Sequence, residues 1–231
     1  MAIHSESDLM KSIFRWLFEP KATFFLIILS VLMFIYQIFF MTEETFTNLV
    51  FQPQHLFELN FIPMVASWFM HGSLAHLAGN MLFLFIFGRI IEKNLGSLKL
   101  IFIYFISAIV SDVFAAFVAL QGGIGASGAI AGLISASILI NPFYITYFLF
   151  IIPIPIILIG WLAIYTDIAG ILNPVQDNIG HFAHLGGYIA VTIGMFFLNR
   201  GEKEKMKKGL IVNFIFLILV FLSYLYLKGL F

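Results

Sequence analysis

Long apolar stretches recur along the chain and constrain its fold more than any other feature of the sequence. A helix that spans a lipid bilayer needs about 20 apolar residues. Seven stretches are candidates for such helices, near 23–41, 75–92, 98–120, 127–141, 144–166, 180–199 and 210–228. Because only 10% of the residues are charged, the chain cannot cover a water-facing surface. It is therefore predicted to be an all-α, polytopic membrane helical bundle.

The fourth stretch, 127–141, is short and rich in Gly, Ala and Ser. Small side chains let neighbouring backbones approach closely, so we expect this helix to be central and wrapped by the others. The stretch 42–74 is too polar and too interrupted to span, yet it is rich in aromatic residues. We expect it to form a structured loop at the membrane interface.

The distribution of Lys and Arg predicts the orientation of the bundle. Of the 12 basic residues, all except Lys228 fall on one side if the helices alternate. The positive-inside rule then places the N-terminus in the cytoplasm and the loops 42–74, 121–126 and 167–179 outside. The organisation predicted is a cytoplasmic amphipathic N-terminal segment over 1–22, with a surface helix at 8–19. A six-helix membrane domain over 23–199 follows, and then 200–231, a basic cytoplasmic turn with an extra spanning helix.

Composition excludes several classes of function. A formal net charge of zero gives no support for a nucleic-acid partner. The absence of cysteine excludes disulfides, thiolate metal sites and a cysteine nucleophile. No internal repeat or HExxH motif is evident, so neither an inverted-repeat transporter nor a zinc protease is favoured. We expect no metal and no cofactor.

Three polar clusters interrupt the apolar helices, and polar groups at membrane depth are functional candidates. They are "HGSLAHLAGN" with His71, His76 and Asn80, "GASGA" around Ser127, and "NIGHFAHLGG" with His181 and His184. In the predicted topology, all three lie toward the outer ends of their helices. We therefore expect them to meet at one depth, although they are far apart in the sequence.

These residue types suit nucleophilic catalysis. A serine hydroxyl needs a base to take its proton, and histidine serves near neutral pH. Ser127 begins a helix, where unpaired backbone N–H groups stabilise an oxyanion. Asp112 lies on another helix and Asp177 in a loop, and neither carboxylate is well placed as a third member. A Ser–His dyad is the simpler prediction, with either His181 or His184 within reach by spacing alone.

With these motifs in hand, the sequence resembles the rhomboid family of intramembrane serine proteases. The resemblance rests on "HGSLAHLAGN", "EKNLGSLKL", "GASG" and "AHLGG", in this order over about residues 68–190. It implies a six-helix core that cleaves transmembrane proteins near the outer membrane face, within the bilayer and without metal or cofactor. It implies Ser127 as nucleophile, His184 as general base, and an oxyanion hole of His76, Asn80 and the Ser127 N–H.

The resemblance also implies supporting roles. His71 would tie down the outer loop, Glu92 and Gly96 would form a cytoplasmic structural motif, and the fifth helix with the loop 167–179 would gate substrate entry. Gly125 allows a sharp turn before the serine, and Gly128 and Gly187 allow the fourth and sixth helices to pack closely. We expect His181 to be a supporting residue.

Two positions depart from the family pattern. Val191 stands where many relatives have Gly, and Ala131 where many have an aromatic residue. These departures leave open a second function, a catalytically silent binder that retains or escorts membrane proteins. The short tails favour a prokaryotic cell membrane.

Overall fold

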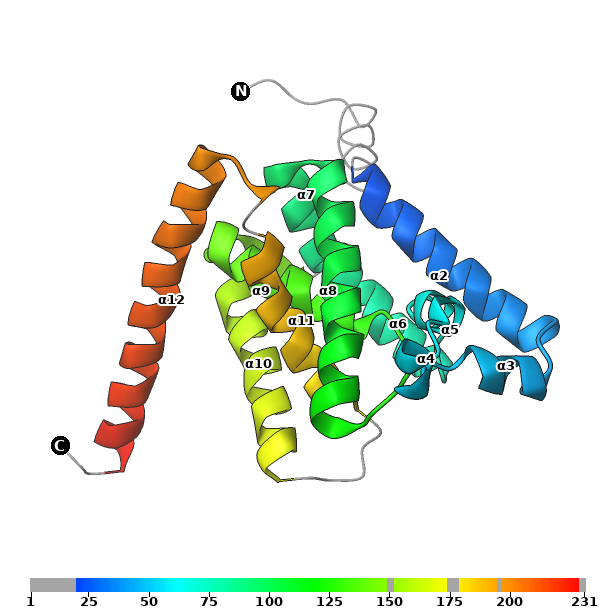
Figure 1. The fold of residues 1–231 in the computed structure, drawn as a ribbon. Helices are drawn as coiled ribbons and strands as arrows, with labels where there is room; N and C mark the ends of the chain where they lie inside the picture. The colour runs from blue at the N-terminus through cyan, green and yellow to red at the C-terminus, as the bar shows by residue number, and fades with distance from the viewer. Residues whose placement is uncertain (1–19, 149–151, 174–178, 195–196, 229–231) are drawn as a thin grey trace, which may run out of the picture.

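The computed structural model describes residues 20–148, 152–173, 179–194 and 197–228, and these form a helical bundle (Figure 1). The predicted surface helix at 8–19 lies outside the described residues. In order, the elements are α2 Lys21–Phe39, α3 Glu43–Leu49, α4 Gln54–Phe57, α5 Phe61–Ser67, α6 Leu74–Phe83, the π-helical η1 Leu84–Gly88, α7 Arg89–Leu95, α8 Ser97–Ala119, α9 Ser127–Ile140, β1 Ile145–Phe148, β2 Ile152–Pro155, α10 Ile156–Leu172, α11 His181–Gly194 and α12 Arg200–Leu227.

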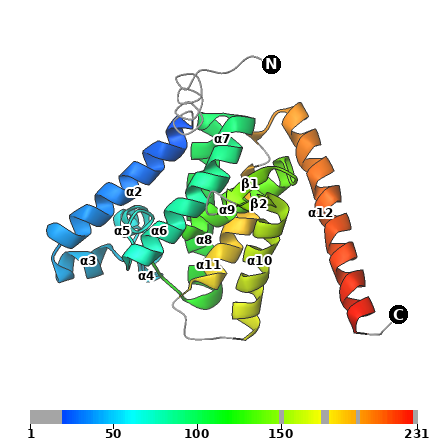
Figure 2. The same ribbon diagram turned by 180° about the vertical axis from the view of Figure 1, so that it is seen from behind.

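Helix α9 is the centre of the bundle, as the small residues of 127–141 predict. Every residue from Gly128 to Ile138 is buried. The helix packs against α8, α10, α11 and α12, and both ribbon views show it enclosed among them (Figures 1 and 2). Since α9 has no lipid-facing stripe, its position is fixed on all sides.

Glycines, which have no side chain, allow α9 to pack closely against its neighbours. A Cβ added at Gly128 would lie 1.9 Å from Ser111 Oγ of α8, and one added at Gly132 would lie 1.9 Å from Ser107 Oγ. A Cβ added at Gly187 of α11 would lie 2.1 Å from the Gly128 carbonyl oxygen. The predicted close packing of the fourth and sixth helices is therefore present, and it requires glycine at these positions.

The lengths of the helices fit a chain that crosses a membrane several times. Among the described residues, four helical runs are long and apolar enough to span: Lys21–Phe39, the continuous run Leu74–Leu95, Ser97–Ala119 and Arg200–Leu227. Helices α9 and α10 are shorter and apolar. In both ribbon views the C-terminal end of α12 stands away from the bundle (Figures 1 and 2), and its apolar side chains there are exposed. The chain is a multi-pass membrane protein.

The predicted fifth helix over 144–166 is wrong in its first part. Residues Ile145–Phe148 and Ile152–Pro155 form an antiparallel hairpin, with Ile145 opposite Pro155. Pro153 and Pro155 have no backbone N–H, so a helix cannot run through them, whereas one can start directly after a proline. Helix α10 accordingly begins at Ile156 and continues to Leu172, past the expected end.

The basic segment 200–208 is the start of α12 rather than a turn. The Asn199 side chain accepts from the Glu202 N–H at 3.0 Å, and the Glu202 carboxylate accepts from the Asn199 N–H at 2.8 Å. This capping box starts the helix at Arg200. Asn213 then fastens α12 to the bundle, because it donates to the Ile138 carbonyl at 2.7 Å and accepts from Trp161 Nε1 at 2.7 Å.

Glu92 joins three segments at the end of the bundle where most basic residues lie. Its carboxylate accepts from the N–H groups of Ala22 and Thr23, each at 2.9 Å, from the Thr23 hydroxyl at 2.8 Å and from the Ser97 hydroxyl at 2.6 Å. Gly96, with φ +89°, turns the chain between α7 and α8. These contacts and this turn account for the structural role predicted for Glu92 and Gly96.

Candidate active site

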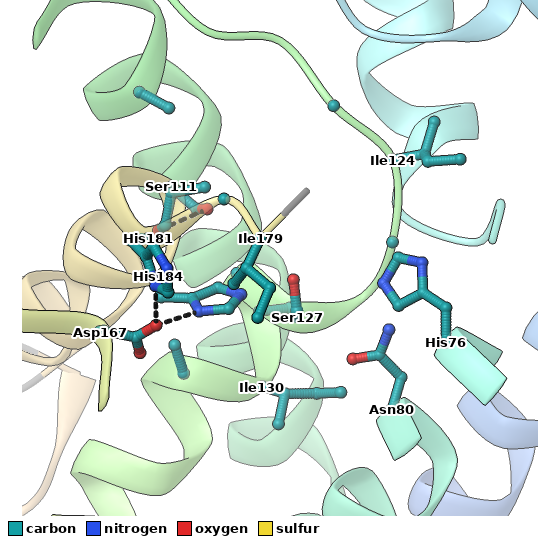
Figure 3. A pocket seen from close by; sticks show the side chains of 18 of the residues that line it. His76, Asn80, Ser111, Ile124, Ser127, Ile130, Asp167, Ile179, His181 and His184 are labelled. Carbon is teal, nitrogen blue, oxygen red and sulfur yellow. Dashed lines mark hydrogen bonds and ion pairs between the residues drawn. The ribbon is translucent and has the colours of Figure 1, made fainter. Parts of the chain in front are cut away.

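A cavity of about 1220 Å³ lies at the opposite end of the bundle. Its walls come from α6, α8, α10, α11 and the segment 121–128 that leads into α9. Figure 3 shows Ser127 between two groups of polar side chains. His76 and Asn80 stand on one side, and Asp167, His181 and His184 on the other.

Ser127 is the first residue of α9, as predicted, and the start of this helix is uncapped by a side chain. The preceding Ala126 makes no side-chain cap, and the Ile130 N–H makes the first helical bond, to the Ala126 carbonyl at 3.0 Å. Gly125 has φ +119°, a conformation that favours glycine, and its N–H donates to the Ser67 carbonyl at 2.8 Å. The first N–H groups of α9 have no partner within the helix, and Gly125, Ser127 and Gly128 line the cavity.

His76 and Asn80 lie beside this turn and carry hydrogen-bond donors. A Cβ added at Gly125 would lie 2.8 Å from His76 Nε2 and 3.4 Å from Asn80 Nδ2, so both nitrogens face the backbone just before Ser127. The Gly72 N–H makes a long hydrogen bond of 3.5 Å to His76 Nδ1, which leaves Nε2 as the proton-bearing nitrogen of a neutral ring. Asn80 Nδ2 is buried and has no hydrogen-bond partner within the described residues.

Across the cavity, a carboxylate of α10 holds the side chains of α11. Asp167 Oδ1 lies 2.8 Å from His181 Nδ1 and 2.8 Å from His184 Nδ1. Tyr188 donates its hydroxyl to Asp167 Oδ2 at 2.6 Å. Both carboxylate oxygens are therefore engaged, and Asp167 is 6% exposed.

The two histidines differ in where their second nitrogen lies. His181 Nε2 packs on α10, because a Cβ added at Gly170 would lie 2.1 Å from it. His184 has its Nδ1 on the same carboxylate and lies one helical turn further along α11, and both histidines line the cavity with Ser127. Because the Nε2 of His181 packs on α10, His184 is the candidate partner of Ser127.

The expectation that no carboxylate is well placed is wrong, because it overlooked Asp167. Sequence reasoning assigned this residue to the edge of the loop 167–179, whereas α10 continues to Leu172. A signal was present, since an acidic residue in an otherwise apolar run is a functional candidate by itself. Asp177 lies outside the described residues. Asp112 accepts from Trp68 Nε1 at 2.7 Å and so bonds a neighbouring segment.

His71 lies in the connection between α5 and α6, behind His76. It is 1% exposed, its Nδ1 lies 3.1 Å from the Phe69 carbonyl, and its backbone N–H donates to Gln37 of α2 at 3.1 Å. Burial lowers the pKa of His71 to about 4, with a smaller contribution from His76. His71 is thus a buried, neutral histidine, and its backbone rather than its imidazole bonds this connection to α2.

The same histidine and aspartate cluster has atoms that could serve as metal ligands. Asp167, His181 and His184 offer one oxygen and two nitrogens within 4.8 Å of one another. Hydrogen bonds account for this spacing equally well, since each Nδ1 can donate to the shared oxygen. The geometry therefore permits a metal without requiring one.

Comparison with known proteins identifies the family to which the chain belongs. The model of the rhomboid domain matches residues 58–201, more than half of the chain. The chain is 30% identical to RHOMBOID-like protein 12, mitochondrial, of Arabidopsis thaliana. The match covers 60% of this chain and 47% of the relative. The chain is 27% identical to Rhomboid protease AarA of Providencia stuartii over 72% of its length and 68% of the relative, and 30% identical to Rhomboid protein 1, mitochondrial, of Saccharomyces cerevisiae over 64% and 45%.

The rhomboid-domain match covers the helices that build the cavity. The chain spans about half the length of the two mitochondrial relatives. The matched residues 58–201 include α6, α9 and α11, which carry the Asn80, Ser127 and His184 side chains. The family and the cavity therefore coincide in one part of the molecule. The chain is a member of the rhomboid family.

Proposed function

We propose that the protein is an intramembrane serine endopeptidase that cleaves transmembrane proteins with Ser127 as nucleophile and His184 as general base. The observation that carries the proposal is the pairing of an uncapped helix start at Ser127 with a buried, unpartnered donor, Asn80 Nδ2, in one cavity of the described residues. A buried donor without a partner is costly. An oxyanion that forms beside Ser127 would accept from it.

The reaction follows from this arrangement. His184 takes the proton of Ser127 Oγ as the oxygen attacks the carbonyl carbon of the scissile peptide. The carbonyl oxygen becomes an oxyanion, which accepts from Asn80 Nδ2, His76 Nε2 and the Ser127 N–H. Protonated His184 then gives its proton to the leaving nitrogen, and the C–N bond breaks to leave an acyl-serine. Water, deprotonated by His184, releases the second product.

The substrates would be single-pass or other transmembrane proteins in the lipid bilayer. A helix in a membrane hydrogen-bonds its peptide groups internally, so a segment must unwind before Ser127 attacks it. Segments with Gly, Pro or polar residues near the cut unwind most readily. The cavity contacts both α6 and α10, and we propose that α10 moves to admit the substrate from lipid. Part of the loop 167–179 that was expected to take part, from 174 to 178, lies outside the described residues.

The experiment compares wild type, Ser127→Ala, His184→Ala and His181→Ala in liposomes, on a tagged substrate with a Gly-rich transmembrane segment. We expect no cleavage by the Ser127 and His184 variants and retained cleavage by the His181 variant. A fluorophosphonate probe should label wild type and leave Ser127→Ala unlabelled. Cleavage by pure Ser127→Ala protein would overturn the mechanism.

Two further measurements test the alternative functions, a silent binder and a metal-dependent enzyme. A wild-type protein that binds membrane proteins but neither cleaves them nor reacts with the probe would be the silent binder. Departures at Ala131 and Val191 are the sequence features that favour it. Loss of cleavage in a metal chelator, restored by added metal, would assign the cluster around Asp167 to metal catalysis. We expect full activity in chelator.

The orientation is also part of the proposal. Basic residues gather at the end of the bundle opposite the cavity, so the positive-inside rule puts the N-terminus in the cytoplasm and the cavity toward the exterior. The relatives include two mitochondrial proteins and a bacterial one, and they give no support for a prokaryotic cell membrane in particular.

A further inference from the structure

Asp167 is a buried carboxylate that the dyad mechanism leaves unused. It comes from α10, whereas its three hydrogen-bond partners, His181, His184 and Tyr188, all come from α11. A carboxylate at membrane depth is costly and is kept where it pairs or acts. The contacts of Asp167 point to an action on the imidazole of His184.

The carboxylate is held in one orientation. Tyr188 occupies Oδ2 at 2.6 Å, so Oδ1 faces the two imidazoles (Figure 3). His181 shares Oδ1 at 2.8 Å, and its own Nε2 packs against Gly170 of α10. Tyr188 and His181 therefore fix the oxygen that His184 contacts, and neither needs to move during a reaction at Ser127.

We propose that Asp167 is a positioning residue for His184, an inference that rests on the proposed function. The Nδ1–H of His184 donates to Asp167 Oδ1 at 2.8 Å, which fixes the neutral tautomer with its proton on Nδ1. Nε2 is then unprotonated and free to accept the Ser127 proton. When it does, the negative carboxylate stabilises the imidazolium and itself stays ionised, so one proton moves from Oγ to Nε2 and no other bond changes.

The location of Asp167 adds a condition. Because Asp167 is on α10 and His184 on α11, the bond exists only while these two helices lie together. A displacement of α10 that separates the pair would remove the carboxylate from the base. The general base is therefore complete only while α10 lies against α11.

The experiment measures kcat and KM for cleavage by wild type, Ser127→Ala, Asp167→Asn and Asp167→Glu in liposomes, with the rate of fluorophosphonate labelling. The amide introduced by Asp167→Asn can donate to Nδ1 of His184 and select the wrong tautomer. We therefore expect kcat to fall by about 10²–10⁴-fold with KM nearly unchanged. Asp167→Glu keeps the charge but moves it by one methylene. Its kcat should fall only about tenfold, so this variant restores part of the loss.

A matched control separates positioning from simple support of the fold. Asn213 also fastens α10 to a neighbouring helix, through Trp161, but away from the cavity. Asn213→Leu should lower the unfolding temperature and leave kcat near that of wild type. Asp167→Asn should show the reverse pattern.

The outcomes distinguish the inference from the function on which it rests. If wild type cleaves, Ser127→Ala does not, and folded Asp167→Asn keeps kcat within about threefold, the positioning role is refuted and the protease stands. Equal losses in kcat for Asp167→Asn and Asn213→Leu refute it as well. If Asp167→Asn does not fold, wild-type kcat in Asp167→Glu refutes it. A wild type that neither cleaves nor labels refutes both proposals.

Discussion

Gly187 sets the distance between α11, which carries the proposed general base, and α9, which begins at the proposed nucleophile. A Cβ added there would lie 2.1 Å from the Gly128 carbonyl oxygen and 2.9 Å from Ala131 Cβ. Real Cβ contacts are essentially never below 3.0 Å, so the backbones must separate by about 0.9 Å. No flexible side chain is available to absorb this, because the nearest atom belongs to the backbone of α9.

The Gly187→Ala substitution should therefore harm activity more than stability. Overpacking of this kind costs roughly 1–3 kcal/mol, of which up to about 1 kcal/mol is offset by the higher helix propensity of alanine. His184 lies one turn from Gly187 on α11 and would move with it. A misplacement of about 1 Å at a reacting group costs on the order of 10²-fold in rate.

The assay is kcat on a tagged transmembrane substrate together with the thermal unfolding midpoint in detergent. Gly194→Ala is the matched control, because it lies on the same helix and its Cβ would make an ordinary 3.7 Å contact with Ile103. We expect about a 10²-fold loss for Gly187→Ala and little change for Gly194→Ala. Equal kcat in the two variants would show that the α9–α11 distance does not limit the reaction.

Three further predictions concern stability. Glu92→Ala removes the acceptor of four hydrogen bonds, from Ala22, Thr23 and Ser97. It should cost about 2–4 kcal/mol, seen as a lower unfolding temperature with kcat unchanged; an unaltered midpoint would contradict this. Because the pKa of His71 is lowered to about 4, the unfolded chain binds an extra proton between that pH and about 6.5. Stability should thus fall by about 3 kcal/mol as pH drops through this window, and unfolding midpoints measured against pH should lose this slope in His71→Gln. Asn199→Ala breaks the α12 capping box and should cost about 1 kcal/mol, whereas an unchanged melting curve would mean that tertiary contacts alone hold the start of α12.

The sequence predicted the existence of the helices and the membrane class correctly, because a lipid bilayer permits few backbone conformations. Backbone groups in a bilayer must be satisfied internally, so an apolar stretch of spanning length becomes a helix. The Gly, Ala and Ser content of 127–141 predicted the burial of α9, because small side chains let neighbouring backbones approach closely. Ser127, His76 and Asn80 could be named because polar residues at membrane depth stand out.

Errors arose where local chemistry overrode hydropathy. Apolar residues continue through 144–155, yet Pro153 and Pro155 stop a helix, and a hairpin takes their place. At 200–208 the charges suggested a turn, whereas Asn199 and Glu202 cap a helix there. Hydropathy averages over a window and does not register a missing N–H or a single cap.

The sequence by itself determined that this chain is a membrane helical bundle, and it predicted a serine, four histidines and an asparagine at matching depths. Only the tertiary structure decided how these groups pair. Asp167 lies 14 and 17 residues before His181 and His184, and no periodicity relates residues on two different helices. Their contact depends on how closely α10 and α11 pack and in what register. That arrangement is set by side-chain volumes across the whole bundle, and a linear pattern of residue types does not contain it.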